Sequence, residues 1–369
     1  MATSLIGAGL AAGAVGMWML STVPGSNDPD AHAAAATTAS FVVAGNGPVN
    51  EISPPTASVG MGVVQLVSQL SPSLVGLVVK KGRESSLVTA VAIADGRLVL
   101  TSASAIVGAT SFGAIMPSGS SVPASLIASD PHAGVAVLRV AGEETGVPRI
   151  ADDALSPGDL AIAVHLVEAQ RPEHAKGRSG SPGPRSSGTG FVTIAELAVG
   201  TVRAVGVNGS AAGQQDGLLD AIEVDAPLAG DSGGAVLLDA RGYVEGILDG
   251  QAGTGDGRVD LFAPAQLAVT AGRLLANGQG GAHGWLGIRG ADASGGGAGV
   301  EQVLPGSAAA LAGLRPGDTI LEVDGKPIRT IAELQAALYV LQPGAPVSFR
   351  VSRGARTFSV DASLGRSPS

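Results

Sequence analysis

Residues 222–247 read IEVDAPLAGDSGGAVLLDARGYVEGI and carry the strongest structural signal in this chain. At the centre, Gly230, Asp231 and Ser232 precede two further glycines, and apolar runs typical of strands lie on both sides. Glycines beside a serine let the backbone turn tightly, expose the hydroxyl and aim N–H groups at a developing oxyanion. The pattern predicts Ser232 as a nucleophile and the backbone N–H groups of Gly230 and Ser232 as an oxyanion hole. The alternative is a glycine-rich turn that only joins two strands.

The surrounding sequence predicts an antiparallel β domain. From Val63 onward, short apolar runs such as LVGLVV and GVAVLRV alternate with Gly, Asp and Pro. Residues 94–97, ADGR, predict a tight two-residue hairpin, because Asp-Gly tolerates positive φ. Residues 167–190 are rich in Pro, Gly, Ser and basic side chains and predict a long mobile surface loop. Residues 264–276 predict a short closing helix, and residues 277–284 a hinge.

Residues 285–364 predict a second folded unit that mixes strands with two helices. Thr330 and Glu333 have the spacing of a capping box, and apolar residues follow at i, i+3 and i+7. Ser307 is placed to start a short alanine-rich helix, which Gly313 can end in a left-handed conformation. One face of the longer helix is therefore expected to be apolar.

Composition excludes several classes of function. A chain of 369 residues has room for two or three packed units, and 45% hydrophobic against 14% charged residues is unlike a disordered protein. The net charge of -9 offers no basic face for phosphates, so nucleic acid is not an expected partner. The absence of cysteine removes disulfides, thiolate catalysis and cysteine zinc sites. The five histidines form no HExxH pattern, so neither a metal nor another cofactor is expected.

The N-terminus is apolar. Residues 1–27 contain no charged side chain, and Leu5 to Val23 is an apolar run nearly long enough to span a hydrocarbon core. This predicts a transmembrane or signal-anchor helix over residues 1–24, with the rest of the chain outside the cytoplasm, and a flexible linker over residues 25–60. Three alternatives remain: a cleaved signal peptide, a wrongly assigned start that omits basic residues, and a glycine-rich buried helix.

The stretch around Ser232 resembles the nucleophile region of trypsin-like proteases, especially those of the HtrA/DegP family, which pair this domain with a PDZ domain. Residues 94–109, ADGRLVLTSASAIVGA, resemble the family's Thr-x-x-His segment. Residues 128–140, ASDPHAGVAVLRV, resemble its Asp-Pro-x-x-Asp segment. The resemblance implies a mainly β chain, with a trypsin-like double β-barrel over residues 61–277 and an α+β PDZ domain over residues 284–366.

Both segments depart from the family at the residue that carries its chemistry. Ser104 stands in place of the histidine base, and Gly134 stands in place of the orienting aspartate. A serine hydroxyl is a poor nucleophile unless a neighbouring base removes its proton. Loss of the base in such an enzyme lowers turnover by about 10⁶-fold. The resemblance combined with these departures predicts a protease domain without activity.

The start of the second unit, GWLGI at residues 284–288, and the following VLPGSAAALAGLRPGDTILEVDGKPI resemble an HtrA-type PDZ domain. The resemblance implies that a peptide C-terminus adds as a strand beside Leu286–Arg289. Its carboxylate would meet loop N–H groups and its last side chain an apolar pocket. The implied peptide-binding residues are Trp285, Leu286, Gly287, Ile288, Ile331, Leu334 and Leu338.

These features predict a membrane-anchored, single-pass HtrA-like pseudoprotease that binds polypeptide C-termini or unfolded segments in extracytoplasmic protein quality control. The alternative is an active serine endopeptidase with a non-standard base, for which His132, His165 and His174 are candidates. A third hypothesis is an assembly platform, because HtrA-like proteins commonly form trimers through the protease domain.

Overall fold

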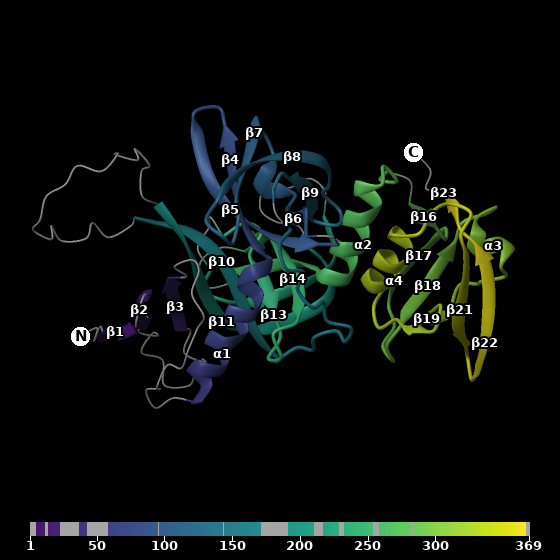
Figure 1. Ribbon diagram of the computed structural model, residues 1–369. Coiled ribbons are helices and arrows are strands. Elements are labelled where there is room, and N and C mark those ends of the chain that lie inside the picture. The colour runs from purple at the N-terminus through teal and green to yellow at the C-terminus, as the bar shows by residue number, and fades with distance from the viewer. Residues whose placement is uncertain are drawn as a thin grey trace, which may run out of the picture.

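The computed structural model covers most of the chain from Ser58 to Arg366 and three short N-terminal segments. The described residues are 5–11, 14–22, 37–42, 58–94, 96–142, 144–170, 191–209, 217–228, 232–253, 258–281 and 283–366. They form two β-barrels followed by a smaller α+β unit, with helix α2 on the side of the barrels that faces this unit (Figure 1). The expected mainly β, double-barrel architecture is therefore confirmed.

The first barrel is a closed ring of strands in the order β4-β5-β6-β9-β8-β7. Its strands are β4 (Leu74–Lys81), β5 (Glu84–Ile93), β6 (Leu98–Ser102), β7 (Ser111–Ile115), β8 (Ser121–Asp130) and β9 (Val135–Val140). Alternate side chains of a strand point to one face, and in β4 the alternating Val75, Leu77 and Val79 are each 0% exposed. They fill the barrel interior, so closure leaves no edge strand to protect.

The second barrel has the strand order β11-β10-β13-β14-β15-β12, closed by pairing of β11 with β12. Its strands are β10 (Leu160–Gln170), β11 (Phe191–Gly209), β12 (Leu218–Asp225), β13 (Val236–Leu238), β14 (Val244–Ala252) and β15 (Val259–Pro264). Small and medium apolar side chains surround Phe262, which is 0% exposed. The barrel core is therefore built mainly from Ala, Val, Ile and Leu, in keeping with the low aromatic content of the sequence.

A further buried cluster joins the two barrels. It draws on α1 (Ser58–Leu70), α2 (Ala265–Ala276) and strands of both barrels, including Val67, Leu100, Ile247 and Ala268. Complete burial of one leucine or valine contributes about 1.5–3 kcal/mol, so a cluster of this size holds the barrels in a fixed relation. Helix α2 confirms the predicted closing helix and begins directly after Pro264.

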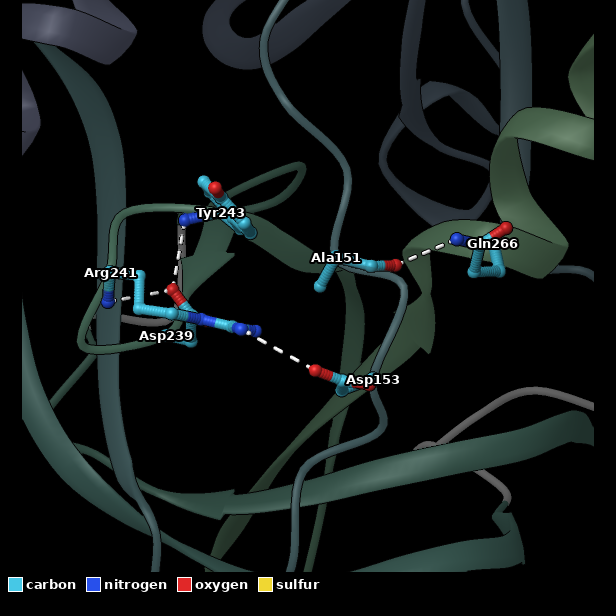
Figure 2. Close-up of polar contacts among 6 residues, drawn as sticks. All are labelled: Ala151, Asp153, Asp239, Arg241, Tyr243 and Gln266. Carbon is cyan, nitrogen blue, oxygen red and sulfur yellow. Dashed lines mark hydrogen bonds and ion pairs between the residues drawn. The ribbon is translucent and has the colours of Figure 1, made fainter.

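The hairpin between β13 and β14 is fastened to the segment that connects the barrels (Figure 2). Asp239 accepts hydrogen bonds from the backbone N–H groups of Arg241 (2.8 Å) and Tyr243 (2.9 Å). The Arg241 guanidinium donates to Asp239 Oδ2 (2.6 Å) and reaches Asp153 Oδ2 (3.4 Å) in the connecting segment. These contacts fix the position of β14, which supplies residues to the seam between the barrels.

The C-terminal unit is a sheet in the order β17-β18-β19-β21-β22, so β17 forms one edge. Its elements are β16 (Gly284–Trp285), β17 (Ile288–Asp292), β18 (Ala298–Val303), α3 (Ala308–Leu311), β19 (Thr319–Val323), β20 (Lys326–Pro327), α4 (Ile331–Tyr339), β21 (Pro346–Arg353), β22 (Arg356–Ser363) and β23 (Gly365–Arg366). A separate core around Phe349, which is 0% exposed, shows that this unit packs on its own apolar residues.

Both helix starts predicted in this unit are confirmed. Ser307 Oγ accepts a hydrogen bond from the N–H three residues later (3.2 Å), and Thr330 Oγ1 accepts one from Glu333 N (3.1 Å). The reciprocal half of the capping box differs, because the Glu333 carboxylate accepts from Arg329 N (2.6 Å) and Arg329 Nε (2.8 Å). In a capping box the Glu333 carboxylate would accept from the backbone N–H of Thr330. Here it accepts from the N–H of Arg329, one residue earlier in the chain.

The predicted hairpin turn is present, but it is longer than expected. Ile93 pairs with Leu98, so four residues rather than two form the connection between β5 and β6. Ala94 and Gly96 adopt positive φ (54° and 73°), whereas Asp95 lies outside the described residues. Position 96 of the turn requires glycine, because a Cβ there would lie 2.3 Å from the Thr145 carbonyl oxygen.

The loop predicted over residues 167–190 begins later than expected. Residues 167–170 continue β10 and pair with β11, and residues 171–190 lie outside the described part of the chain. The predicted hinge at residues 277–284 starts at Asn277, the C-cap of α2, and ends where β16 begins. The proposed domain boundaries stay predictions.

The apolar N-terminal run differs from the expected helix. Residues there form β1 (Leu5–Ala11) and β2 (Ala14–Thr22), and β3 (Thr37–Val42), inside the expected linker, pairs with β11. The expectation of an N-terminal helix is therefore not met, and glycine, which costs about 1 kcal/mol per residue in a helix, recurs through this run. Among the described residues, no helix combines the length and apolarity needed to cross a membrane.

Candidate active site

Ser232 lies in a tight turn directly before β13. Its carbonyl accepts a hydrogen bond from Ala235 N (2.9 Å), and Gly233 O accepts one from Thr89 N (3.2 Å) of the first barrel. Gly234 has φ 75°, and a Cβ there would lie 2.0 Å from the Thr89 carbonyl oxygen, so only glycine fits. Glycine at position 234, two residues after this serine, is therefore required by close contact between the two barrels.

The Ser232 hydroxyl is buried, with the residue 2% exposed, and its Oγ has no hydrogen-bond partner among the residues that the structure describes. Gly230, the expected oxyanion-hole residue, lies outside those residues together with Asp231. The oxyanion hole thus stays a prediction. What the structure adds is that no described histidine is hydrogen-bonded to the serine oxygen.

Ser104, expected in the place of the base, begins the short helix η2 (Ser104–Ile106) after β6 and contacts Asp249 of β14 twice. Ser104 N donates to Asp249 Oδ1 (3.0 Å), and the Ser104 hydroxyl donates to the Asp249 carbonyl. Ser102 Oγ donates to the same Oδ1 (2.8 Å). Asp249 is only 3% exposed, so its carboxylate is held inside the protein by these serine contacts.

Gly134, expected in the place of the orienting aspartate, also lies close to Asp249. Its carbonyl accepts from Ala103 N (3.2 Å), which brings it next to the Ser104 turn. Its φ is 66°, and a Cβ there would lie 2.4 Å from Leu218 Cδ1 and 3.2 Å from Asp249 Cβ. The two positions at which the sequence is expected to depart from the family therefore both lie beside Asp249, which spacing along the chain did not indicate.

The expected peptide-binding residues gather around β17 and α4. A Cβ on Gly290 of β17 would lie 3.3 Å from Ile331 Cδ1, so the Ile331 side chain covers this strand. Asp292 Oδ1 accepts from Ile331 N (2.7 Å) and ties the end of β17 to the start of α4. Leu334 and Leu338 are 1% and 6% exposed and belong mainly to the core of the unit. Trp285 ends β16, Leu286 and Gly287 connect β16 to β17, and Ile288 begins the edge strand β17; Leu286 is buried.

Comparison with known proteins identifies both parts of the chain. Residues 88–247 match the trypsin-like peptidase domain, and residues 299–353 match the PDZ domain. The periplasmic pH-dependent serine endoprotease DegQ of Escherichia coli (strain K12) is 31% identical over 68% of this chain and 53% of DegQ. The chain is HtrA/DegP-like. The periplasmic serine endoprotease DegP of the same organism is 26% identical over 74% of the chain and 56% of DegP.

The HtrA/DegP-like chain thus spans about half the length of these curated relatives, 53% of DegQ and 56% of DegP. A solved structure, the HtrA-type protease AlgW with a tripeptide, covers 83% of the chain and 97% of its own, at a TM-score of 0.54 and 22% identity. This likeness supports the shared fold.

The candidate substitute bases in this HtrA/DegP-like chain have other contacts. His165 is 4% exposed in β10, and its Nε2 lies 3.5 Å from Glu196 Oε2 on the paired strand. His132 is exposed, with Nδ1 3.3 Å from the Gly217 carbonyl oxygen and its ring edge-on to Tyr339. His174 lies outside the described residues. The two candidate bases that the structure describes, His132 and His165, are therefore engaged away from the serine oxygen.

Helix α4 also contacts the protease-like barrels, which the sequence did not indicate. The Tyr339 hydroxyl donates to Asp130 Oδ1 (3.0 Å), and the His283 ring stacks on Tyr339 at 3.6 Å between centroids. Asn208 Nδ2 donates to Gln335 Oε1 (2.7 Å). The helix that borders the β17 edge is therefore the same helix that joins the C-terminal unit to both barrels.

Proposed function

We propose that this HtrA/DegP-like chain is a pseudoprotease that binds polypeptide C-termini or unfolded segments and does not cleave them. The observation that supports this most directly is Ser104, whose hydroxyl stands where the base is required and bonds Asp249 instead. Without a base, Ser232 keeps its proton and attacks carbonyl groups poorly. The names of the relatives point to periplasmic proteolysis, and we infer a role in extracytoplasmic protein quality control.

The absence of proteolysis is tested directly on the purified protein. We expect no labelling of Ser232 by a fluorophosphonate and no cleavage of unfolded casein above the level of a Ser232→Ala variant. DegQ, assayed in parallel, is the positive control for both reagents. Labelling or cleavage by the wild-type chain that Ser232→Ala abolishes would instead favour an endopeptidase with a base of its own, as the relatives' names suggest.

Peptide binding is proposed at the β17 edge, where an added strand can pair with free backbone groups and a terminal side chain can contact α4. We expect peptides with a free C-terminal carboxylate to bind and their amidated forms to bind at least about tenfold more weakly, a loss of about 1.4 kcal/mol. Fluorescence anisotropy with labelled peptides measures both. Equal binding of the two forms would show that the domain does not recognise the C-terminal carboxylate.

The apolar wall of this site supplies a variant with a matched control. Ile331→Ser removes the side chain that covers β17 and is expected to weaken peptide binding about tenfold. Leu311→Ser changes a leucine that is 84% exposed on α3 in the same domain, so its affinity should match the wild type. Isothermal titration of both variants separates loss of the site from loss of the domain.

We propose that the protein acts outside the cytoplasm, in keeping with the periplasmic relatives, and that its apolar N-terminal run holds it at the membrane. The strands observed in this run do not support a helical anchor. Fractionation of cells that express the full chain, with extraction by carbonate and by detergent, tests the attachment. Recovery in the soluble fraction would reject it. The homotrimer implied by the resemblance stays a prediction.

A further inference from the structure

Asp249 is a buried carboxylate that the proposed function leaves without a role. It lies on β14 of the second barrel, yet Ser102 Oγ and Ser104 N, which both donate to its Oδ1, belong to the first barrel. A carboxylate that is 3% exposed is costly to bury unless hydrogen bonds compensate it, and here donors from the turn beside the serine site do so. Its placement calls for a chemical explanation.

The position of Asp249 matches that of the acid the chain lacks. The Cβ of Asp249 lies 3.2 Å from the point that a Cβ on Gly134 would occupy, so the two β-carbons are adjacent and would be in tight contact. Because that contact is tighter than ordinary van der Waals separation, a side chain at position 134 and the present Asp249 could not both be accommodated without movement. Glycine at 134 and aspartate at 249 are therefore two parts of one arrangement.

The Asp249 carboxylate also points at Ser104, the residue in the place of the base. In a Ser-His-Asp site the acid fixes the orientation of the base, and such sites are recognised by geometry rather than by position in the sequence. Asp249 Oδ1 lies 3.0 Å from the backbone nitrogen of Ser104, the residue in the place of the base. A Cβ on Gly233 would lie 2.9 Å from the Ala105 methyl group, so the Ser104 turn borders the Ser232 turn.

We propose that this serine site retains its orienting carboxylate, delivered by Asp249 from β14 instead of by residue 134, and that a base at position 104 is the single missing member. Asp249 is thus a positioning residue without a base to position. This inference rests on the proposed absence of a base. It implies that Ser104→His alone makes Ser232 reactive: the imidazole takes the Oγ proton, the oxygen bonds the phosphorus of a fluorophosphonate, and fluoride leaves.

The experiment measures the rate of fluorophosphonate labelling of Ser104→His against pH. We expect labelling at least about 10²-fold faster than in the wild type, rising through the titration of an imidazole with a reference pKa of about 6.5. Adding Asp249→Asn is expected to remove most of this gain and to move the pH profile to lower pH, because the neighbouring negative charge is lost. Adding Ser232→Ala abolishes labelling.

A second variant keeps the proposal testable if Ser104→His does not fold, as judged by circular dichroism. Ser104→Gly opens space, and added imidazole should accelerate its labelling when Asp249 is present but not in the Asp249→Asn background. Folded Ser104→His that labels no faster than wild type, or equal labelling with and without Asp249, would overturn the proposal. Labelling of the wild type contradicts the pseudoprotease function instead, so the two failures are distinguishable.

Discussion

Gly134→Asp, the substitution that returns the family residue, is expected to destabilise the protein and to leave Ser232 unreactive. Gly134 has φ 66°, and a side chain in this left-handed region costs about 1–2 kcal/mol. A Cβ would also lie 2.4 Å from Leu218 Cδ1, in a core where overpacking costs about 1–3 kcal/mol. We therefore expect the free energy of unfolding to fall by about 2–5 kcal/mol, measured by urea denaturation at neutral pH.

Gly134→Ala is the matched control, because it adds the same Cβ at the same φ without a charge. The further loss in Gly134→Asp then reports the second carboxylate beside Asp249, where like charges oppose each other. That extra loss should shrink at acidic pH, where a carboxyl can take up a proton. If Gly134→Asp were as stable as wild type, Asp249 would not occupy the place of the family carboxylate in the way described above.

Acidification from pH 8 to pH 5 is expected to raise the thermal midpoint of the protein. Burial raises the pKa of Asp220 to about 7, with Glu333 of α4 acting in the same direction and Arg329 against it. Burial likewise raises the pKa of Glu245 to about 7 and that of Asp260 to about 6. These three carboxyls of the folded protein therefore take up protons as the pH falls below neutral.

The direction of the effect follows from linkage between protonation and folding. A carboxyl whose pKa is higher in the folded state binds its proton more tightly there than in the unfolded chain, so stability decreases as pH rises between the two values. For Asp220 and Asp260 this window starts at the reference value of 3.8 and ends at about 7 and about 6. Scanning calorimetry at several pH values measures the slope.

Asp220→Asn isolates the contribution of Asp220, which lies between the second barrel and α4, to the pH dependence of the thermal midpoint. Asparagine tolerates the positive φ of 56° at this position, and it cannot ionise, so the midpoint should depend less on pH. Asp324→Asn is the matched control, because Asp324 also has positive φ (49°) but is exposed. An unchanged slope in Asp220→Asn, or an equal change in the control, would show that Asp220 is not a source of the pH dependence.

Features that depend on neighbours in the chain were predicted well. The Thr330 and Ser307 caps were read correctly because a side-chain oxygen bonds an N–H three residues away. The turn at Gly234 needs positive φ, and the glycine-rich motif around Ser232 predicts such a turn. The hairpin at Gly96 was placed correctly, although its length was not, because loop length depends on strand register. The N-terminal run was expected to be helical from apolarity alone, which does not distinguish a helix from strands.

The sequence alone was enough to predict an antiparallel β domain from local pattern, and its resemblance to the HtrA/DegP family implied the double barrel, the PDZ domain and Ser104 as the position of the base. Folding in three dimensions decided where Asp249 lies, because Ser104 and Asp249 are 145 residues apart and meet only when the barrels pack together. It also decided that α4 borders the β17 edge and the second barrel at once. The hydrogen bonds that Asp249 and α4 make with distant residues, and the burial that raises the pKa of Asp220, are properties of such long-range contacts, and no local pattern encodes them.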